Sequence, residues 1–285
     1  MSDESVILEE SAPLDLRLSE AELAATREHI TAFVESMVER AGADGAVLGL
    51  SGGIDSTLTA HLAVEALGTD RVHGLVMPSE VNAADNMSDA ERVASDLGIE
   101  YDVIDIGPIF DAFVEAFPGD ATADRIDTDP LRTAAGNVRV RIRAVLDYFV
   151  ANAENRIVLG TGNRSEALTG YFTKYGDGAV DCHPIGNLYK QQVRQLAAYV
   201  GVDDDLVTKT PSAEMWTGQT DEEEMGLGYD TLDAVLALHV DGPLSKAATV
   251  RHLDVAPAQV DRVVELYDRS AHKRAMPPSP EPLYR

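Results

Sequence analysis

The chain has only one cysteine, Cys182, among its 285 residues. A single cysteine excludes an intrachain disulfide and a cysteine-rich metal centre. The sequence also lacks an apolar stretch approaching the ~20 residues of a membrane span. Its acidic beginning, MSDESVILEE, lacks the basic start of a signal peptide. We therefore expect a soluble cytoplasmic protein that does not bind membranes.

Lysine and net positive charge are also scarce. The chain has 18 arginines but only 5 lysines, and 49 acidic residues give a formal net charge of −26. The electrostatic field of so large a negative charge opposes binding to nucleic acid. A hydrophobic share of 45% is normal for a folded protein, so disorder does not explain the acidity. We interpret the surface as halophilic, because molar salt shortens the Debye length to ~3 Å and screens the repulsion. Loss of structure in low salt is the prediction.

Four of the five lysines lie in distinctive segments. These are Lys174, Lys190, Lys209 and Lys273, whereas Lys246 lies in an ordinary helical stretch. An ammonium group acts as a point charge on phosphate or carboxylate in a way that arginine does not reproduce. The alternative is chance placement, but we expect functional roles for the first four.

Apolar runs of strand type alternate with segments of helical period in the first part of the chain. The expected strands are 45–50, 72–77, 101–106 and 156–159, and the expected helices are 20–41, 56–67, 83–97, 110–117 and 130–153. Ser19 and Glu22 form a capping box before the first helix. Strands that alternate with helices predict an α/β fold with a doubly wound parallel sheet flanked by helices.

The pattern is less regular after residue 160, where helices are expected at 189–200, 229–239 and 257–270, the last of them ending the helical part. The polar stretch 208–226 has the length and glycines of a lid over a site. No linker or repeat interrupts the chain, so we expect one domain over residues 1–285. Residues 1–18 would be a flexible arm, and residues 276–285 a proline-rich tail.

The string LGLSGGIDST, residues 48–57, has the pattern of a phosphate-binding loop. A strand, a turn at Ser51-Gly52-Gly53 and a helix follow one another, so free N–H groups and the positive dipole end meet at the turn and favour an anion. The glycines allow close approach of the backbone. Asp55 adds a hard oxygen ligand suited to Mg²⁺. Because no Gly-Lys-Ser/Thr occurs, a Walker-type loop is excluded.

The segment GTGNRSEALTGYFTKY, residues 160–175, supplies further candidates. Thr161 could hydrogen-bond a nucleotide at a strand end, and Glu166 could complete a Mg²⁺ site with Asp55. The alternative for Glu166 is an acid that stabilises a helix N-terminus. Gly160 and Gly162 hint at a dinucleotide fingerprint, but no third glycine follows at the required place, which excludes hydride transfer.

Several other residues have two interpretations. In GNVRVRIR, residues 136–143, Arg139 and Arg143 share a helix face, and Arg141 points elsewhere and is the preferred ligand contact. The alternative is a solvated basic face. The run His272-Lys273-Arg274 could compensate a helix dipole or contact phosphate or carboxylate. Cys182 has no evident base beside it, so we interpret it as a small core residue.

Taken together, five strings resemble ammonia-dependent NAD synthetases, a family of ATP pyrophosphatases. The strings are LSGGIDS, GNVRVRIR, GTGNRSEALTGYFTKYGDGAVDCHPIGNLYK, KTPSAEMWTGQTDEEEMGLGYDTLD and HKR. They occur in the family's order and cover residues 20 to 275. The third string is the most specific, because other ATP pyrophosphatases share the loop but not that segment.

The resemblance implies the fold of adenine nucleotide alpha hydrolases and a role for each matching residue. Asp55 and Glu166 would hold Mg²⁺, and with Lys190 and Asp181 they would form the catalytic set. ATP would be bound by Gly49, Leu50, Ser51, Gly52, Gly53, Ile54, Asp55, Ser56, Thr161, Lys190 and Ser212. Deamido-NAD would be bound by Arg141, Lys174, Asp181, His272 and Lys273. The family also implies a homodimer whose dinucleotide site draws on both subunits.

In the implied reaction, the nicotinate carboxylate of deamido-NAD attacks the α-phosphorus of ATP and pyrophosphate leaves. Ammonia then attacks the acyl-adenylate, giving NAD and AMP. Asp181 is one candidate for the base that receives a proton from ammonia, and the question stays open. We expect free ammonia as donor, because no amidase domain fits before residue 20, with a partner amidase as the alternative. The rival functions are another ATP pyrophosphatase and a non-catalytic nucleotide sensor.

Overall fold

The computed structural model describes residues 16–80, 84–116, 131–212, 216, 219–281 and 283, with the backbone alone for residues 84–87. Parts of the expected arm, of the lid and of the tail lie outside these ranges, as do the predicted helix end at Phe117 and the predicted helix start at Pro130.

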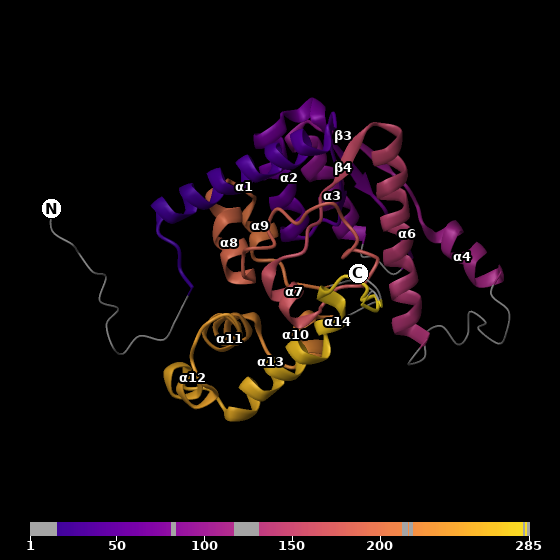
Figure 1. Cartoon of the computed structure of the whole chain (residues 1–285). Coiled ribbons are helices and arrows are strands. Elements are labelled where there is room, and N and C mark those ends of the chain that lie inside the picture. Colours follow the sequence, from indigo (N-terminus) through magenta and orange to yellow (C-terminus); the bar gives the residue numbers. More distant parts are fainter. Residues whose placement is uncertain are drawn as a thin grey trace.

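A parallel four-stranded sheet forms the centre of the molecule (Figure 1). Its strands are β1 (Gly45–Leu50), β2 (Val72–Val76), β3 (Glu100–Val103) and β4 (Arg156–Val158), in the order β3-β2-β1-β4. All four predicted strands are confirmed, although the predicted run 101–106 ends early, at Val103. The order reverses between β1 and β4, because the chain runs outward from β1 through β2 to β3 and then returns to the other side of β1. In such sheets this switch point is where ligands bind, at the carboxyl ends of the strands.

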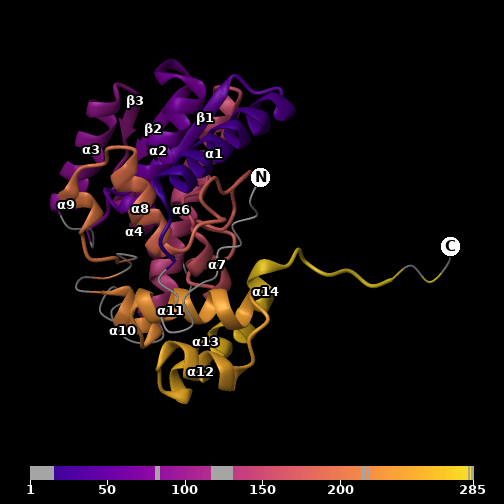
Figure 2. The ribbon, with the colours of Figure 1, turned by 90° about the vertical axis from the view of Figure 1, so that its left-hand side faces the viewer.

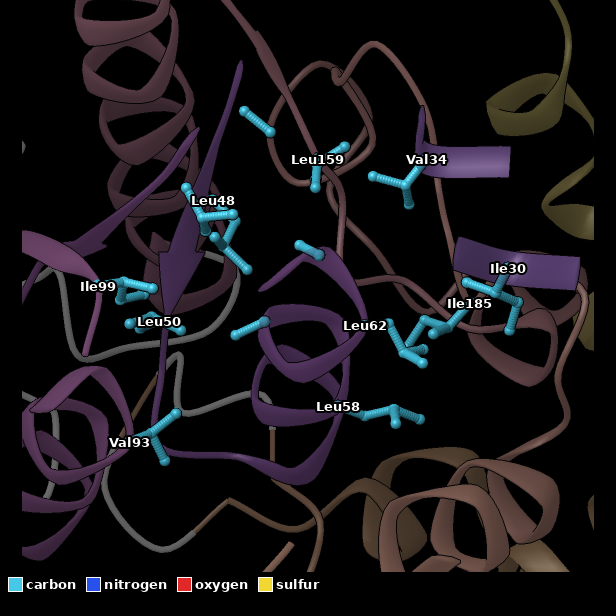
Figure 3. Packing of buried hydrophobic residues seen from close by; sticks show 14 of the residues in the cluster. Ile30, Val34, Leu48, Leu50, Leu58, Leu62, Val93, Ile99, Leu159 and Ile185 are labelled. Carbon is cyan, nitrogen blue, oxygen red and sulfur yellow. The ribbon is translucent and has the colours of Figure 1, made fainter. Parts of the chain in front are cut away.

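Helices cover both faces of the sheet, as the doubly wound prediction required. The β1 side chains alternate: Leu48 and Leu50 pack with α1 (Glu20–Ala41), α2 (Ile54–Leu67), α3 (Ala84–Leu97) and α8 (Lys190–Tyr199), as Figure 3 shows. Val47 faces the other way, toward α6 (Leu131–Ala153). Two apolar cores therefore hold the sheet between helical layers, since successive residues of a strand face opposite sides.

Capping residues set the beginnings of the helices. The predicted box before α1 is confirmed, because the Glu22 amide donates to Ser19 Oγ at 3.3 Å and the Ser19 amide donates to Glu22 Oε2 at 2.7 Å. Helix α2 begins at Ile54, two residues before the predicted start, because Gly53 takes the N-cap position. On the far side of the sheet, α4 (Gly107–Ala116) precedes α6.

Helices of the last third of the chain form a separate layer with its own apolar core (Figure 2). They are α10 (Asp221–Met225), α11 (Tyr229–Val235), the π-helical turn η2 (Leu236–Val240), α12 (Lys246–Leu253), α13 (Pro257–Arg269) and α14 (Ala271–Arg274). The sequence interpretation was wrong in two places here. The expected helix 229–239 changes to a π turn after Val235, and α13 is not the last helix, because α14 follows it.

Several short elements escaped the sequence interpretation, among them α10, which lies within the expected lid. The turn η1 (Thr69–Arg71) leads into β2, α7 (Arg164–Thr169) follows β4, and α9 (Asp204–Val207) follows α8. Each is too short to show a helical period in the sequence. No described helix is long and apolar enough to cross a membrane.

Candidate active site

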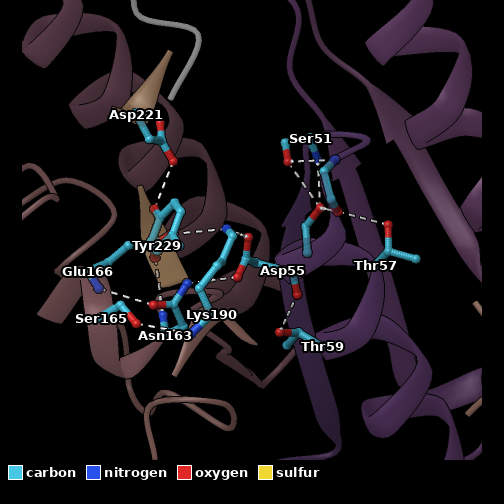
Figure 4. A network of polar contacts seen from close by, with 12 residues as sticks. Ser51, Asp55, Thr57, Thr59, Asn163, Ser165, Glu166, Lys190, Asp221 and Tyr229 are labelled. Carbon is cyan, nitrogen blue, oxygen red and sulfur yellow. Dashed lines mark hydrogen bonds and ion pairs between the residues drawn. The ribbon is translucent and has the colours of Figure 1, made fainter. Parts of the chain in front are cut away.

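The loop between β1 and α2 is cross-linked by its own hydroxyls (Figure 4). Ser56 Oγ donates to the Gly53 carbonyl at 3.0 Å and accepts from the Ser51 amide at 3.2 Å. The Gly53 amide donates to Ser51 Oγ, also at 3.2 Å. Gly52 has a φ of +72°, which only glycine adopts without strain. This arrangement places the N-terminus of a 14-residue helix at the switch point of the sheet, where an anion is favoured.

Two carboxylates and one ammonium meet beside this loop. Asp55 lies in the first turn of α2, Glu166 in α7 and Lys190 at the first residue of α8. Lys190 Nζ forms an ion pair with Asp55 and lies 3.5 Å from Glu166 Oε1. The Lys190 side chain is only 3% exposed and each carboxylate 18%. The structure thus brings together three residues that the sequence interpretation assigned to one centre.

Asn163 positions both carboxylates, and the sequence interpretation gave it no role. As N-cap of α7 it accepts from the Glu166 amide at 3.0 Å, while Glu166 Oε2 accepts from the Asn163 amide at 3.2 Å. Its Nδ2 donates to Asp55 Oδ1 at 2.9 Å, and the residue is fully buried. The pattern Asn-x-x-Glu before a helix is a capping box, and this signal could have identified it.

The centre holds more carboxyl groups than cationic groups. Burial, reinforced by Asp55 and opposed by Lys190, raises the pKa of Glu166 to about 8. Burial also raises the pKa of Asp221, whose Oδ2 accepts from the Tyr229 hydroxyl at 2.8 Å. Burial alone would lower the pKa of Lys190, but Asp55 and Glu166 outweigh it and raise that pKa.

The excess of carboxyl groups over cationic groups suits the binding of a divalent cation. Asp55 and Glu166 offer hard carboxylate oxygens, and both lie beside the same ammonium, that of Lys190. No group of three or more His, Cys, Asp or Glu side chains within the described ranges is arranged to hold a metal alone. Mg²⁺ that arrives with a nucleotide needs only one or two carboxylates, because phosphates and water complete its shell.

A second set of buried contacts fixes the start of α8. The Lys190 amide donates to Ser165 Oγ at 3.0 Å, and that hydroxyl donates to Asp233 Oδ1 at 2.5 Å. The Gln191 amide donates to Asp233 Oδ2 at 2.9 Å. Asp233 is fully buried, and burial raises its pKa to about 6 although the Ser165 hydrogen bond lowers it. The sequence interpretation missed Ser165 and Asp233, which hold Lys190 in place from behind.

Four of the residues expected to bind deamido-NAD form a basic cluster. The Arg141 guanidinium donates to the Lys174 carbonyl at 3.0 Å, and Lys174 Nζ donates to the His272 carbonyl. Lys273 Nζ donates to the carbonyls of Gly170 and Phe172, at 2.8 and 2.7 Å. The cluster joins α6, the segment after α7 and α14. The short helix α14 therefore delivers His272 and Lys273 to the same region as Arg141.

Three other expected site residues lie outside this cluster, two of them beside the end of β4. Asp181 is held beside β4, where Oδ2 accepts from the Val158 amide at 2.7 Å and Oδ1 accepts from the Tyr148 hydroxyl at 3.3 Å. Thr161 lies three residues beyond the end of β4. Ser212 Oγ donates to the Gln219 carbonyl at 2.7 Å, across the stretch expected to form a lid.

Cys182 is a core residue, as expected. It is buried, and burial together with Asp181 raises the pKa of its thiol to about 11, so it is not a thiolate nucleophile. The glycines of the Gly160-x-Gly162 pair have a packing role. A Cβ on Gly160 would lie 2.5 Å from His183 Nδ1, and one on Gly162 would lie 3.3 Å from it.

Comparison with known proteins agrees with this geometry. The sequence model of the NAD synthase family matches residues 26–277. The chain is 60% identical over 269 residues to the NH(3)-dependent NAD(+) synthetase of Halobacterium salinarum, covering 94% of this chain and 97% of that protein.

Solved structures also resemble this one. A structure of NMN synthetase from Francisella tularensis has a TM-score of 0.77 and 34% identity, covering 93% of this chain and 99% of that one. An NH3-dependent NAD synthetase from Campylobacter jejuni has a TM-score of 0.73 and 32% identity, covering 91% and 99%. From its sequence, its sheet and its relatives, the chain belongs to the NAD synthase family.

Proposed function

We propose that this enzyme joins ammonia to deamido-NAD in an ATP-dependent reaction that yields NAD, AMP and pyrophosphate through an acyl-adenylate. One observation carries the proposal: the Asp55–Glu166–Lys190 centre adjoins an amide-rich helix N-terminus at the switch point of a parallel sheet. The 60% identity to an NH(3)-dependent NAD(+) synthetase supports the choice of substrates.

The leaving pyrophosphate would be stabilised by the loop from Gly49 to Ser56. Donors aimed at a developing negative charge are the main catalytic device for phosphate chemistry. The first-turn amides of α2, the hydroxyls of Ser51 and Ser56, and the Lys190 ammonium are the groups placed for this task. Thr161 and Ser212 would contact other parts of ATP.

Asp55 and Glu166 would hold Mg²⁺ that enters with ATP. A bound Mg²⁺ neutralises charge on the phosphates and orients them for in-line displacement. Asn163 would keep both carboxylates in place for this role, because it hydrogen-bonds to each of them.

The basic cluster would hold deamido-NAD. Arg141, Lys174 and Lys273 offer cationic groups to its phosphates and its carboxylate, and His272 adds an imidazole beside them. The nicotinate carboxylate would then face the α-phosphorus of ATP. The contribution of the enzyme to this step would largely be to position the two substrates. Asp181 stays a candidate both for a dinucleotide contact and for the base that takes a proton from ammonia.

We also propose that the enzyme is a homodimer. Helix α6 exposes Val145 and Phe149, which are 68% and 70% accessible, and the neighbouring α4 exposes Ile109 and Phe113. Several exposed apolar side chains on two packed helices are typical of a protein–protein interface. The same α6 carries Arg141, so a partner bound to this face would lie close to the dinucleotide site.

Three broader properties belong to the same proposal. The chain would work as one domain, which the single family match over residues 26–277 supports. It would act in the cytoplasm, since a lone buried cysteine suits a reducing compartment. Its net charge of −26 suits a cytoplasm rich in salt.

The test is an assay with deamido-NAD, MgATP and ammonium in molar KCl, following NAD, AMP and pyrophosphate together. We expect the three products in equal amounts. Because one structural neighbour is an NMN synthetase, the acid form of NMN is run in parallel as a competing substrate. Faster turnover of the acid form of NMN than of deamido-NAD would show that the mononucleotide is the substrate. Pyrophosphate release with a tRNA acceptor, or ATP bound without turnover, would favour the rival functions.

A further inference from the structure

Lys209 ties the loop between β1 and α2 to two other segments. It lies just after α9, and its Nζ donates to the Gly52 carbonyl at 3.0 Å. The same Nζ contacts Asp89 Oδ2 of α3 at 2.5 Å. The side chains of Lys209 and Asp89 are 27% and 22% exposed, so the ion pair is partly shielded from solvent. One ammonium group thus links three elements at the edge of the phosphate loop.

The Gly52 carbonyl belongs to a peptide unit whose other end faces the loop. In a trans peptide the C=O and the following N–H point in opposite directions. The Lys209 ammonium holds the C=O end, and the Gly53 N–H end donates to Ser51 Oγ of the same loop at 3.2 Å. Both flanking residues are glycines, so little in the local chain prevents this peptide from rotating.

We propose that Lys209 is a positioning residue that fixes the Gly52–Gly53 peptide with its N–H toward the bound phosphates. This inference rests on the proposed role of residues 49–56 in binding pyrophosphate. A rotated peptide would present a carbonyl oxygen to an anion and would repel it. A preorganised donor costs no rearrangement when the charge develops, which is the condition for effective stabilisation.

A chain of ion pairs holds Lys209 itself. Asp89 also accepts from Arg92 at 3.1 Å, and Arg92 reaches Asp205 of α9 at 2.8 Å. Lys209 therefore sits between α3 and α9 with its ammonium already engaged by a carbonyl and a carboxylate. This favours a positioning role over the alternative, in which Lys209 leaves Gly52 and contacts phosphate directly.

The experiment measures the affinity of inorganic pyrophosphate with Mg²⁺ by calorimetry, in molar KCl to screen the general field. Lys209→Met should weaken binding about tenfold, the size expected for one lost charge-assisted hydrogen bond. Asp89→Asn keeps Lys209 but removes its anchor and should also weaken binding. Lys246→Met and Asp261→Asn are matched controls, because they break a Lys–Asp ion pair far along the chain and should change nothing.

The sign of the Asp89→Asn effect separates the two roles. Tighter pyrophosphate binding by this variant, relative to Asp261→Asn, would overturn the inference, because an ammonium released from its carboxylate would then be binding phosphate. Unchanged affinity in both Lys209→Met and Asp89→Asn would overturn it as well. Asp89→Asn keeps the test decisive even if Lys209→Met does not fold.

A separate variant tests the assumption beneath the inference. Ser56→Ala removes a hydroxyl that binds inside the loop. If Ser56→Ala weakens pyrophosphate binding and Lys209→Met does not, only the role of Lys209 is wrong. If neither weakens it, the proposed phosphate loop is wrong too.

Discussion

The side chains of the Asp55–Glu166–Lys190 centre share their hydrogen-bond and ion-pair partners, so each one restricts the positions of the others. Asp55 and Glu166 share one ammonium, and Asn163 donates to both of them. Replacing Lys190 would remove the ammonium that both carboxylates contact, and replacing Asn163 would remove the side-chain donor of Asp55. A cluster of ionisable groups with a raised carboxyl pKa, at the switch point of a parallel sheet, is typical of a functional site.

Asp55→Ala should abolish most turnover and leave the fold intact. Asp55 would be a ligand of Mg²⁺ and is the partner of Lys190, so we expect activity to fall on the order of a hundredfold or more. Pyrophosphate release measures the effect, and the far-ultraviolet circular dichroism spectrum serves as the control for folding. Near-normal turnover would show that Asp55 is not a ligand of Mg²⁺.

Asp147 on α6 predicts a pH dependence of stability. Burial, partly opposed by Arg143, raises its pKa from 3.8 to about 7 in the folded protein. The folded state therefore holds this proton more tightly, and its contribution to stability is lost as the pH rises from about 4 through 7. Asp147→Asn should consequently show a smaller fall in melting temperature between pH 5 and pH 8. Parallel curves for the two proteins would contradict this.

At the scale of elements, the sheet and the short helices were not equally visible in the sequence. Strands β1, β2 and β4 were predicted because buried parallel strands are continuous apolar runs, whereas the edge strand β3 is mostly exposed. Helix α14 has only four residues and follows Ser270, where α13 ends, so no local signal separates it from a loop. Yet α14 carries His272 and Lys273 to the basic cluster, where Lys273 is held by two carbonyls.

The exposed face of α6 leads to a prediction for assembly. Phe149→Asp should convert the proposed homodimer to monomers, because a charge on the interface must be desolvated to bind. Light scattering after size-exclusion chromatography gives the mass. Ser36→Asp, on the exposed side of α1, is the control that adds the same charge elsewhere. An unchanged dimer in Phe149→Asp would exclude this face as the interface.

The large negative net charge affects the stability of the whole molecule. A net charge of −26 over 285 residues implies self-repulsion throughout the surface, and only screening or cation binding can offset it. Isolated exposed ion pairs such as Lys246–Asp261 contribute little on their own. The stability of the folded state should therefore depend on the salt concentration as well as on the three apolar cores.

Salt should consequently raise the melting temperature. We expect the melting temperature to increase steadily from dilute buffer to molar KCl, with loss of structure at the low end, because the Debye length shortens to ~3 Å. Calorimetry or circular dichroism across a KCl series measures this, with sorbitol as a control for general solute effects. A melting temperature independent of KCl would show that the acidity is not an adaptation to salt.

The sequence by itself determined the chemistry, because the strand, the Ser-Gly-Gly turn and Asp55 are neighbours along the chain, and their local order is sufficient for a phosphate loop. It also determined the charge and the family strings. Only the tertiary structure decided which side chains meet. Lys190 reaches Asp55 across 135 residues, and Lys209 reaches Gly52 across 157. Such contacts depend on how helices pack around the sheet, and periodicity along the chain does not encode that packing.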